Sequence, residues 1–125
     1  MINSVQPRKQ RKFRFTAPMH LRKKMVSAHV SKELAAKLPN KKRSLPLRKG
    51  DKVKVMRGED KGKIGKVMEV ELSTLKVYVE GVVNRTAKGV EKPKPTDPSN
   101  LLIIEAEMGA DRLAMVARAP AKKKA

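Results

Sequence analysis

A short stretch near the middle of the chain, RGEDKGKIGK, combines glycines with closely spaced cations, and this combination can hold a phosphate group. Gly58 and Gly62 permit positive φ angles and a close approach of the backbone to a ligand. Exposed backbone amides beside cationic side chains make a good cradle for phosphate. At least one of the two glycines also has a structural role in shaping the hairpin. The candidate residues of this loop are Arg57, Gly58, Lys61, Gly62, Lys63 and Lys66.

This loop differs from the nucleotide-binding P-loop, whose pattern is GxxxxGK[ST]. Three residues separate Gly58 from Gly62, and Ile64 follows Lys63 where the pattern requires Ser or Thr. The stretch therefore predicts phosphate contact without nucleotide hydrolysis.

A second candidate site lies near the N-terminus, where two of the three aromatic residues alternate with cations. Phe13 and Phe15 are interleaved with Lys12 and Arg14. Aromatic rings stack on bases while cations bind phosphates, so this pattern is typical of contact with nucleic acid. The structural alternative is that one of the rings fills a gap between this arm and the folded body.

The charge of the chain supports a polyanionic partner. The net charge is +19, from 31 Lys and Arg residues against 12 Asp and Glu residues. Residues 1–44 hold 13 of these cations and a single acid, Glu33. A run so one-sided repels itself unless a polyanion binds it, which makes a merely solvated charged face a weak alternative. Nucleic acid is the expected partner, and an anionic membrane surface is the second.

Several other classes of function find no support in the residues. No stretch approaches the roughly 20 apolar residues of a membrane span, although the Arg-rich start leaves a mitochondrial transit peptide as an alternative. The chain has no cysteine and two histidines, so no metal site is predicted. Glu59 and Asp60 are adjacent acids on a loop, which more often balance lysines than catalyse proton transfer. We therefore predict no enzyme, no cofactor and no small-molecule substrate.

The elements that must position the loop are short strands. Apolar residues alternate at 53–55 before it, and further runs follow at 64–70 and at 75–79, the last ending at Gly81. A wholly apolar strand is expected at 101–104. Short strands at such close spacing predict a small barrel, whose core is too small for a buried catalytic pocket. The functional residues should therefore lie on its surface.

Two details of these strands are also predicted. The spacing of Ile64, Val67 and Val70 breaks period-two alternation, which indicates a β-bulge near Gly65. The segment that follows the third strand is rich in Pro, Gly and Lys, and a short strand is expected near residues 88–92.

The flanking segments predict short helices. The stretch PRKQRKFRF should be disordered alone, because like charges repel and little apolar surface drives folding. A helix is expected over 16–26 with Pro18 in its first turn. Another begins after the N-cap Ser31, packs its leucines on the barrel and stops at Pro39. A last helix is expected around 111–116, before a frayed AKKKA end.

The predicted protein is thus mostly β, with three parts. Residues 1–44 form a basic arm with one or two short helices, residues 45–105 form the barrel, and residues 106–125 form a short helix and a basic tail.

The stretch GDKVKVMRGEDKGKIGKVMEV resembles the KOW motif, in which alternating apolar residues surround a required glycine, here Gly62. The motif also occurs in transcription elongation factors, so the family has to be identified from the segments on either side of the motif. The stretches KFRFTAPMHLRKKMVSAHVSKELAAKL and RSLPLRKGDKVKVMRG closely resemble the archaeal and eukaryotic members of a universal large-subunit ribosomal protein family. Its bacterial name is L-twenty-four and its eukaryotic name L-twenty-six. VYVEGVVNR and PSNLLIIE are also similar, and the segment 82–100 is more typical of archaeal members.

This resemblance implies an SH3-like (KOW) barrel that binds the 5′ region of large-subunit ribosomal RNA early in assembly. It also implies a cytoplasmic location in the large subunit, near the nascent-chain exit, in one copy per ribosome and beside other large-subunit proteins. The arm, the turn before the first barrel strand, the glycine loop and a later loop would contact RNA. The predicted rRNA-binding residues are Arg8, Lys9, Arg11, Lys12, Phe13, Arg14, Phe15, Arg22, Lys23, Lys24, Arg48, Lys49, Arg57, Gly58, Lys61, Gly62, Lys63, Lys66, Asn84 and Arg85.

Two other functions remain open at this point. A transcription elongation factor built around a KOW module is one, although the chain has no second domain of the kind that clamps RNA polymerase. A DNA-bending, chromatin-like protein is the other, and comparable affinity for random duplex DNA and ribosomal RNA would support it.

Overall fold

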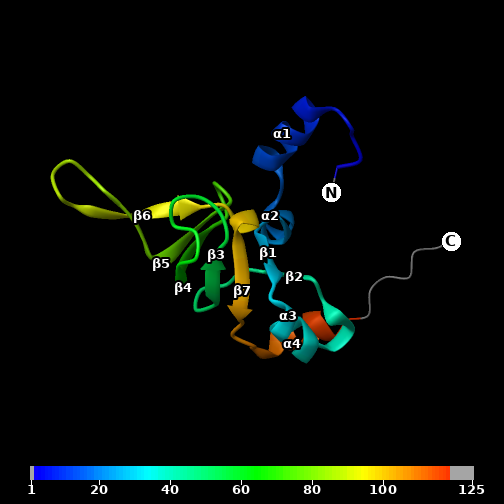
Figure 1. Ribbon diagram of the computed structural model, residues 1–125. Coiled ribbons are helices and arrows are strands. Elements are labelled where there is room, and N and C mark those ends of the chain that lie inside the picture. The colour runs from blue at the N-terminus through cyan, green and yellow to red at the C-terminus, as the bar shows by residue number, and fades with distance from the viewer. Residues whose placement is uncertain (1, 119–125) are drawn as a thin grey trace.

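The computed structural model describes residues 2–118, with Lys41 described by its backbone alone. Within this range the strands form one seven-stranded sheet in the order β2-β1-β7-β3-β4-β5-β6 (Figure 1). Neighbouring strands are antiparallel, except that β1 and β7 run parallel. This confirms the predicted mostly-β, SH3-like fold class. The strands are β1 (Ser27–Val30), β2 (Ser44–Pro46), β3 (Lys52–Val55), β4 (Ile64–Glu71), β5 (Lys76–Arg85), β6 (Glu91–Thr96) and β7 (Leu101–Glu105).

Alternation along three strands builds the core. In β3, in residues 76–79 of β5 and in residues 101–104 of β7, every second residue is buried, whereas the residues between them are half-buried. This is the two-residue period of a strand with one face on a core. The predicted strands at 53–55, 75–79 and 101–104 are therefore confirmed. Their buried residues are Val53, Val55, Val77, Val79, Leu101 and Ile103.

The bulge in β4 lies later than predicted. The pairing of β4 with β5 shifts register between Val67 and Glu69, so the extra residue is Met68. This insertion accounts for the three-residue spacing of Val67 and Val70, which both contact the core, whereas Ile64 is exposed. Gly65 has a different role, because an added Cβ there would lie 2.3 Å from the backbone oxygen of Glu80. The glycine is required because β4 and β5 approach closely at this point.

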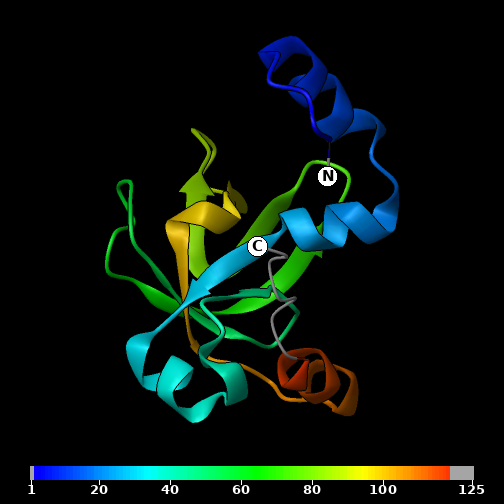
Figure 2. The ribbon, with the colours of Figure 1, turned by 90° about the vertical axis from the view of Figure 1, so that its right-hand side faces the viewer.

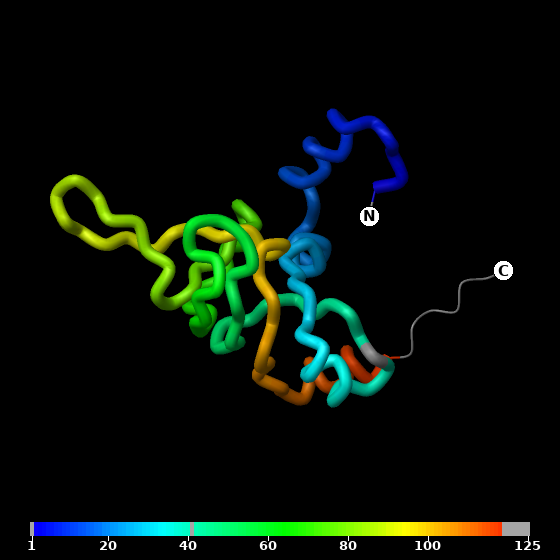
Figure 3. The backbone as a smooth tube through the Cα atoms, viewed as in Figure 1, coloured from blue at the N-terminus to red at the C-terminus, as the bar shows by residue number. Residues whose placement is uncertain are grey.

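Strand β5 does not end at Gly81, which corrects the prediction. Gly81 takes a φ of 79° and the strand continues to Arg85. Beyond Gly81 the strand pairs with β6 in a hairpin that extends away from the rest of the chain (Figure 3). The strand expected near 88–92 is β6 and begins three residues later. Its prolines are tolerated because β6 is an edge strand, where a missing N–H costs no ladder hydrogen bond.

Strand β1 comes from the segment predicted to be an arm, and β2 begins at its last residue, Ser44. β1 pairs with β7, and its Ala28 and Val30 point into the core. The buried Val26 just before β1 accepts a hydrogen bond from the Leu47 amide at 3.0 Å. The proposed division at residue 45 stays a prediction, but the sheet itself begins earlier, at β1. A four-residue strand with only two apolar inward positions leaves too weak a pattern to detect.

Three of the helices agree with the sequence. Helix α2 (Met19–Met25) begins after Pro18, and helix α4 (Ala110–Ala117) lies where a helix was expected. Helix α3 (Lys32–Lys37) is capped by Ser31, whose hydroxyl accepts a hydrogen bond from the Leu34 amide at 3.2 Å. Two 3-10 turns, η1 (Pro39–Lys41) and η2 (Pro98–Asn100), complete the elements. The frayed end predicted for 121–125 lies outside the described residues.

The first basic run is helical rather than disordered, which corrects the prediction. Helix α1 (Pro7–Thr16) has a proline in its first turn, followed mainly by Arg, Lys and Gln, which are good helix formers. It buries none of its own residues within the described chain. Figures 1 and 2 both show α1 projecting away from the sheet, at the opposite end from α3 and α4. Its helicity is therefore a local property of this segment.

A buried ion pair, which the sequence does not reveal, attaches α4 to the sheet. Asp51 and Arg112 have no exposed surface, and their two oxygen–nitrogen contacts measure 2.5 Å and 2.9 Å. The carboxylate also accepts hydrogen bonds from the backbone amides of Arg48 and Glu107. The guanidinium donates to the carbonyl oxygen of Pro46 at 3.0 Å. Such a pair is stable only when hydrogen bonds satisfy most of its polar atoms. Here they satisfy both carboxylate oxygens and both terminal guanidinium nitrogens, whereas Arg112 Nε is buried without a partner among the described residues.

Candidate nucleic-acid interface

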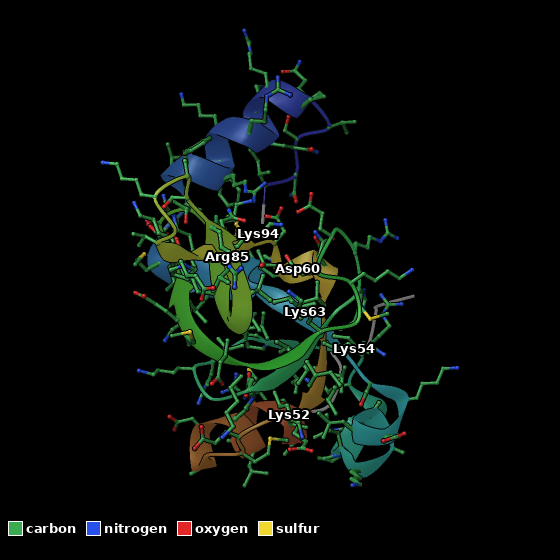
Figure 4. All side chains as sticks on the ribbon, turned by 60° about the vertical axis from the view of Figure 1, so that its left-hand side comes forward. Lys52, Lys54, Asp60, Lys63, Arg85 and Lys94 are labelled. Atoms are coloured by element: carbon green, nitrogen blue, oxygen red, sulfur yellow. The ribbon has the colours of Figure 1, made fainter. Side chains whose placement is uncertain are left out.

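The glycine loop joins β3 to β4, and its acids are held by lysines. Gly58 and Gly62 both take a φ of 92°, the left-handed region that favours glycine. The Asp60 carboxylate lies 2.7 Å from the Lys63 ammonium and 3.1 Å from that of Lys94 on β6 (Figure 4). Lys94 also lies 3.1 Å from a carboxylate oxygen of Glu59. The negative charges of Glu59 and Asp60 are therefore neutralised by lysines of the same chain.

These contacts shift the titration of the groups involved. The hydrogen bonds from Lys63 and then Lys94 lower the pKa of Asp60 below its usual value. The hydrogen bonds to Glu59 and then Asp60 raise the pKa of Lys94. At neutral pH Asp60 is therefore ionised and Lys94 is protonated, and their contact joins the loop to the β5–β6 hairpin.

We expect the contacts of Asp60 with Lys63 and Lys94 to weaken in acid. Because the folded pKa of Asp60 is lowered, its stabilising effect is complete above the ordinary carboxyl pKa and is lost as pH falls through the folded value. The difference in melting temperature between the native chain and Asp60→Asn should therefore be constant above about pH 5 and shrink in acid. Thermal unfolding at a series of pH values measures this. A difference that stays constant to the lowest pH would contradict the assignment.

The outer side of β3 and β4 adds cations that the sequence prediction missed. Lys52 and Lys54 alternate with buried valines and so face outward, and Lys52 pairs in register with Lys66 on β4. Figure 4 shows Lys63, Lys54 and Lys52 following one another along the sheet. Lys52 contacts the exposed Glu105 at 3.1 Å. The KVKV alternation was the signal that could have revealed these lysines.

A second group of predicted residues gathers where α2 meets the turn before β3. Lys23, Arg48 and Lys49 line one hollow of about 580 Å³, together with Met68, Glu69, Val70 and Asp111. The turn is held to β4 because the Gly50 amide donates to the Val67 carbonyl at 2.9 Å. Residues 25 positions apart in the sequence are thus brought to one surface.

The arm presents most of its predicted residues to solvent. Phe15 is 75% exposed and Phe13 is half-buried, so Phe15 has the ring surface that stacking on a base requires. The five cations of α1 are all exposed, namely Arg8, Lys9, Arg11, Lys12 and Arg14.

Arg22 differs from the other predicted residues because its guanidinium is used within the protein. Its Nε donates to the Ala17 carbonyl at 3.0 Å, and its Nη1 donates to the Ser73 carbonyl at 3.2 Å. Its Nη2 donates to the carbonyl oxygen of Phe15. This side chain joins α1 and α2 to the β4–β5 turn and thereby sets the direction in which the arm leaves the sheet.

The remaining predicted residues lie on the β5–β6 hairpin. Asn84 and Arg85 are exposed, and Arg85 contacts Glu91 on the facing strand at 2.9 Å. Lys24 is exposed on α2 but does not line the α2–turn hollow. Apart from Arg22 and Lys24, the predicted residues occupy four surface groups: α1, the α2–turn hollow, the glycine loop and this hairpin. Within residues 2–118, no cluster of three or more metal-ligating side chains is found, and no helix has the length and apolar character to cross a membrane.

A family model that describes a set of ribosomal proteins, L-twenty-six in eukaryotes and L-twenty-four in archaea, matches residues 4–119. The chain belongs to this family. The match spans the arm, the sheet and α4, so it covers every predicted site residue.

Membership confirms the resemblance and makes the chain an archaeal-type ribosomal protein of the large subunit in the cytoplasm. Membership favours the ribosomal prediction over the alternative of a transcription elongation factor. The family is one of ribosomal proteins and not of enzymes. The four cationic groups thus belong to a protein that is built into a ribonucleoprotein particle.

Proposed function

We propose that this chain binds the 5′ region of large-subunit ribosomal RNA, promotes early assembly of the subunit and lies near the nascent-chain exit. The observation that carries RNA binding is the arrangement of charge around the glycine loop. Glu59 and Asp60 are occupied by Lys63 and Lys94, while Arg57, Lys61 and Lys66 are exposed. The assembly role and the exit location rest on the family resemblance alone.

The mechanism is charge neutralisation combined with shape. Cations of the loop and the α2–turn hollow displace counterions from RNA phosphates, which makes affinity depend steeply on salt. The rigid sheet fixes the distance between these two groups. Helix α1, which projects from the body, then enters between RNA segments, where Phe15 can stack on a base.

Deleting residues 2–16 is expected to weaken RNA binding without unfolding the sheet. The deletion removes five exposed cations and α1, none of whose residues is buried in the described structure. The slope of log K against log salt concentration should fall by about 4 if each cation meets one phosphate. Filter binding to a transcript of the 5′ region at several salt concentrations measures the slope, and circular dichroism monitors the fold.

Two controls make this result specific. A full-length chain with the five α1 cations replaced by glutamine keeps the helix and should lose the same slope. Native chain should bind the 5′ transcript about 10³-fold more tightly than a 3′ transcript or duplex DNA of equal length. Equal affinity for all three would contradict the proposal, and loss of the sheet on deletion would contradict the division into arm and body.

A further inference from the structure

A hollow on the outer face of β4, β5 and β6 adjoins the α2–turn hollow, with which it shares Met68 and Glu69, but its own lining holds two acids and one lysine. Its volume is about 450 Å³, and its apolar lining consists of Met68, Tyr78 and Pro93. The Met68 side chain is 52% exposed, which is unusual for a large apolar residue beside other apolar groups. The hollow is thus an apolar surface that the described part of this chain leaves uncovered.

The charges around this hollow are mainly acidic. Glu69 and Glu71 line it, and Lys92 is its single lysine in the described structure. Glu80, two residues beyond Tyr78 on β5, does not line this hollow but another one, together with Lys52 and Lys66. The nearby Lys76 is occupied, since its ammonium lies 2.7 Å from Asp97. In a chain of net charge +19 this is an exceptional surface.

One of the two acids, Glu71, is held in position and in the ionised form. Glu71 accepts hydrogen bonds from Ser73 at 2.8 Å and from the Tyr78 hydroxyl at 3.2 Å. The hydrogen bond from Ser73 is the main reason that the pKa of Glu71 is lowered. A fixed carboxylate beside an aromatic ring repels phosphate, so RNA is a poor occupant of this hollow.

We propose that this hollow is a docking surface for a basic segment of a neighbouring protein, whose Lys or Arg side chains pair with Glu69 and Glu71 over the apolar floor. A large ribosomal subunit contains RNA and proteins, and the carboxylates of the hollow repel RNA phosphates. Charge complementarity therefore favours a protein segment as the occupant. The long stems of Lys and Arg also cover apolar surface while their charged ends reach carboxylates. Pro93 and Pro95 remove two backbone donors from the β6 edge, which favours docking on the face over addition of a strand.

Site-specific photo-crosslinking in purified large subunits tests this surface. Tyr78 is replaced by p-benzoyl-phenylalanine in the full chain, and the crosslinked partner is identified by mass spectrometry of the peptides. The expected product joins Tyr78→p-benzoyl-phenylalanine to a peptide of another protein that carries net positive charge. The same substitution at Phe15 should instead crosslink to ribosomal RNA, so failure of RNA binding is distinguished from failure of this proposal.

A matched pair of variants tests the role of charge. Glu69→Gln with Glu71→Gln keeps size and hydrogen-bonding capacity, and should reduce the protein crosslink by roughly five-fold. Glu33→Gln with Glu107→Gln makes the same change in net charge outside the hollow, at two exposed side chains, and should leave the yield unchanged. The proposal is overturned by a crosslink to RNA, to this chain itself or to an uncharged or acidic peptide. Absence of a macromolecular crosslink, or equal loss with both pairs, overturns it too.

Discussion

Replacing Arg112 by methionine is expected to lower the free energy of unfolding by about 3–5 kcal/mol. The substitution leaves the Asp51 carboxylate buried without its charge partner, although two backbone amides still donate to it. The cost arises from an uncompensated buried charge, since a methionine fills much of the same space. Urea-induced unfolding followed by circular dichroism measures the change.

Arg118→Met is the matched control for this prediction, because Arg118 ends the same helix and is exposed. It should change stability by less than about 0.5 kcal/mol. Arg112→Met combined with Asp51→Asn should recover part of the loss, because both charges are then removed. Equal effects of Arg112→Met and Arg118→Met would show that the pair does not hold α4 on the sheet.

The second large effect is expected from Gly65→Ala, which should destabilise the chain by about 3 kcal/mol or more. The new Cβ would lie 2.3 Å from the Glu80 carbonyl oxygen and 3.0 Å from a Val79 methyl carbon. Neither strand can move aside easily, because Val67 and Val79 pair across β4 and β5 and are both buried in the core. The melting temperature and urea midpoint report the loss.

Substitutions at two other glycines distinguish the stability cost of a steric clash from the cost of backbone strain. Gly58→Ala adds a methyl where no heavy atom of the described chain lies within 4 Å, but φ is 92°, so a cost of about 1–2 kcal/mol is expected. Gly109→Ala also meets open space, at an ordinary φ of −74°, and should cost about 0.5–1 kcal/mol, because Ala is a poorer N-cap than Gly. The order Gly65, Gly58, Gly109 is the predicted outcome, and a Gly65→Ala chain as stable as Gly109→Ala would refute the close approach.

Local patterns account for what could be predicted from the sequence. The alternation in KVKV and in the run around Val77 identifies two strands, because period-two burial is a property of one strand and one face. The continuous apolar run at 101–104 identifies a third. Ser31 identifies the start of α3 because its hydroxyl bonds an amide three residues away. The glycine loop and the charged arm were equally visible, since both are continuous stretches of sequence.

Part of the candidate interface depended on contacts that no local pattern contains. Asp60 and Lys94 are 34 residues apart, so the balancing of the loop acids appears only when β6 is placed beside the loop. The gathering of Lys23 with Arg48 and Lys49 likewise needs α2 to lie next to the turn. Sequence reasoning listed the cations, but not which acids were neutralised.

The fold class, the family and the charged segments could be predicted from local patterns, because composition, alternation and motif spacing depend on a few neighbouring residues. Three features are visible in the folded chain alone. β1 pairs with β7, the bulge lies at Met68, and Asp51 contacts Arg112, which is 61 positions away in the sequence. Each of these is a pairing between distant segments, stabilised by burial and hydrogen bonds that exist only after the chain has closed on itself.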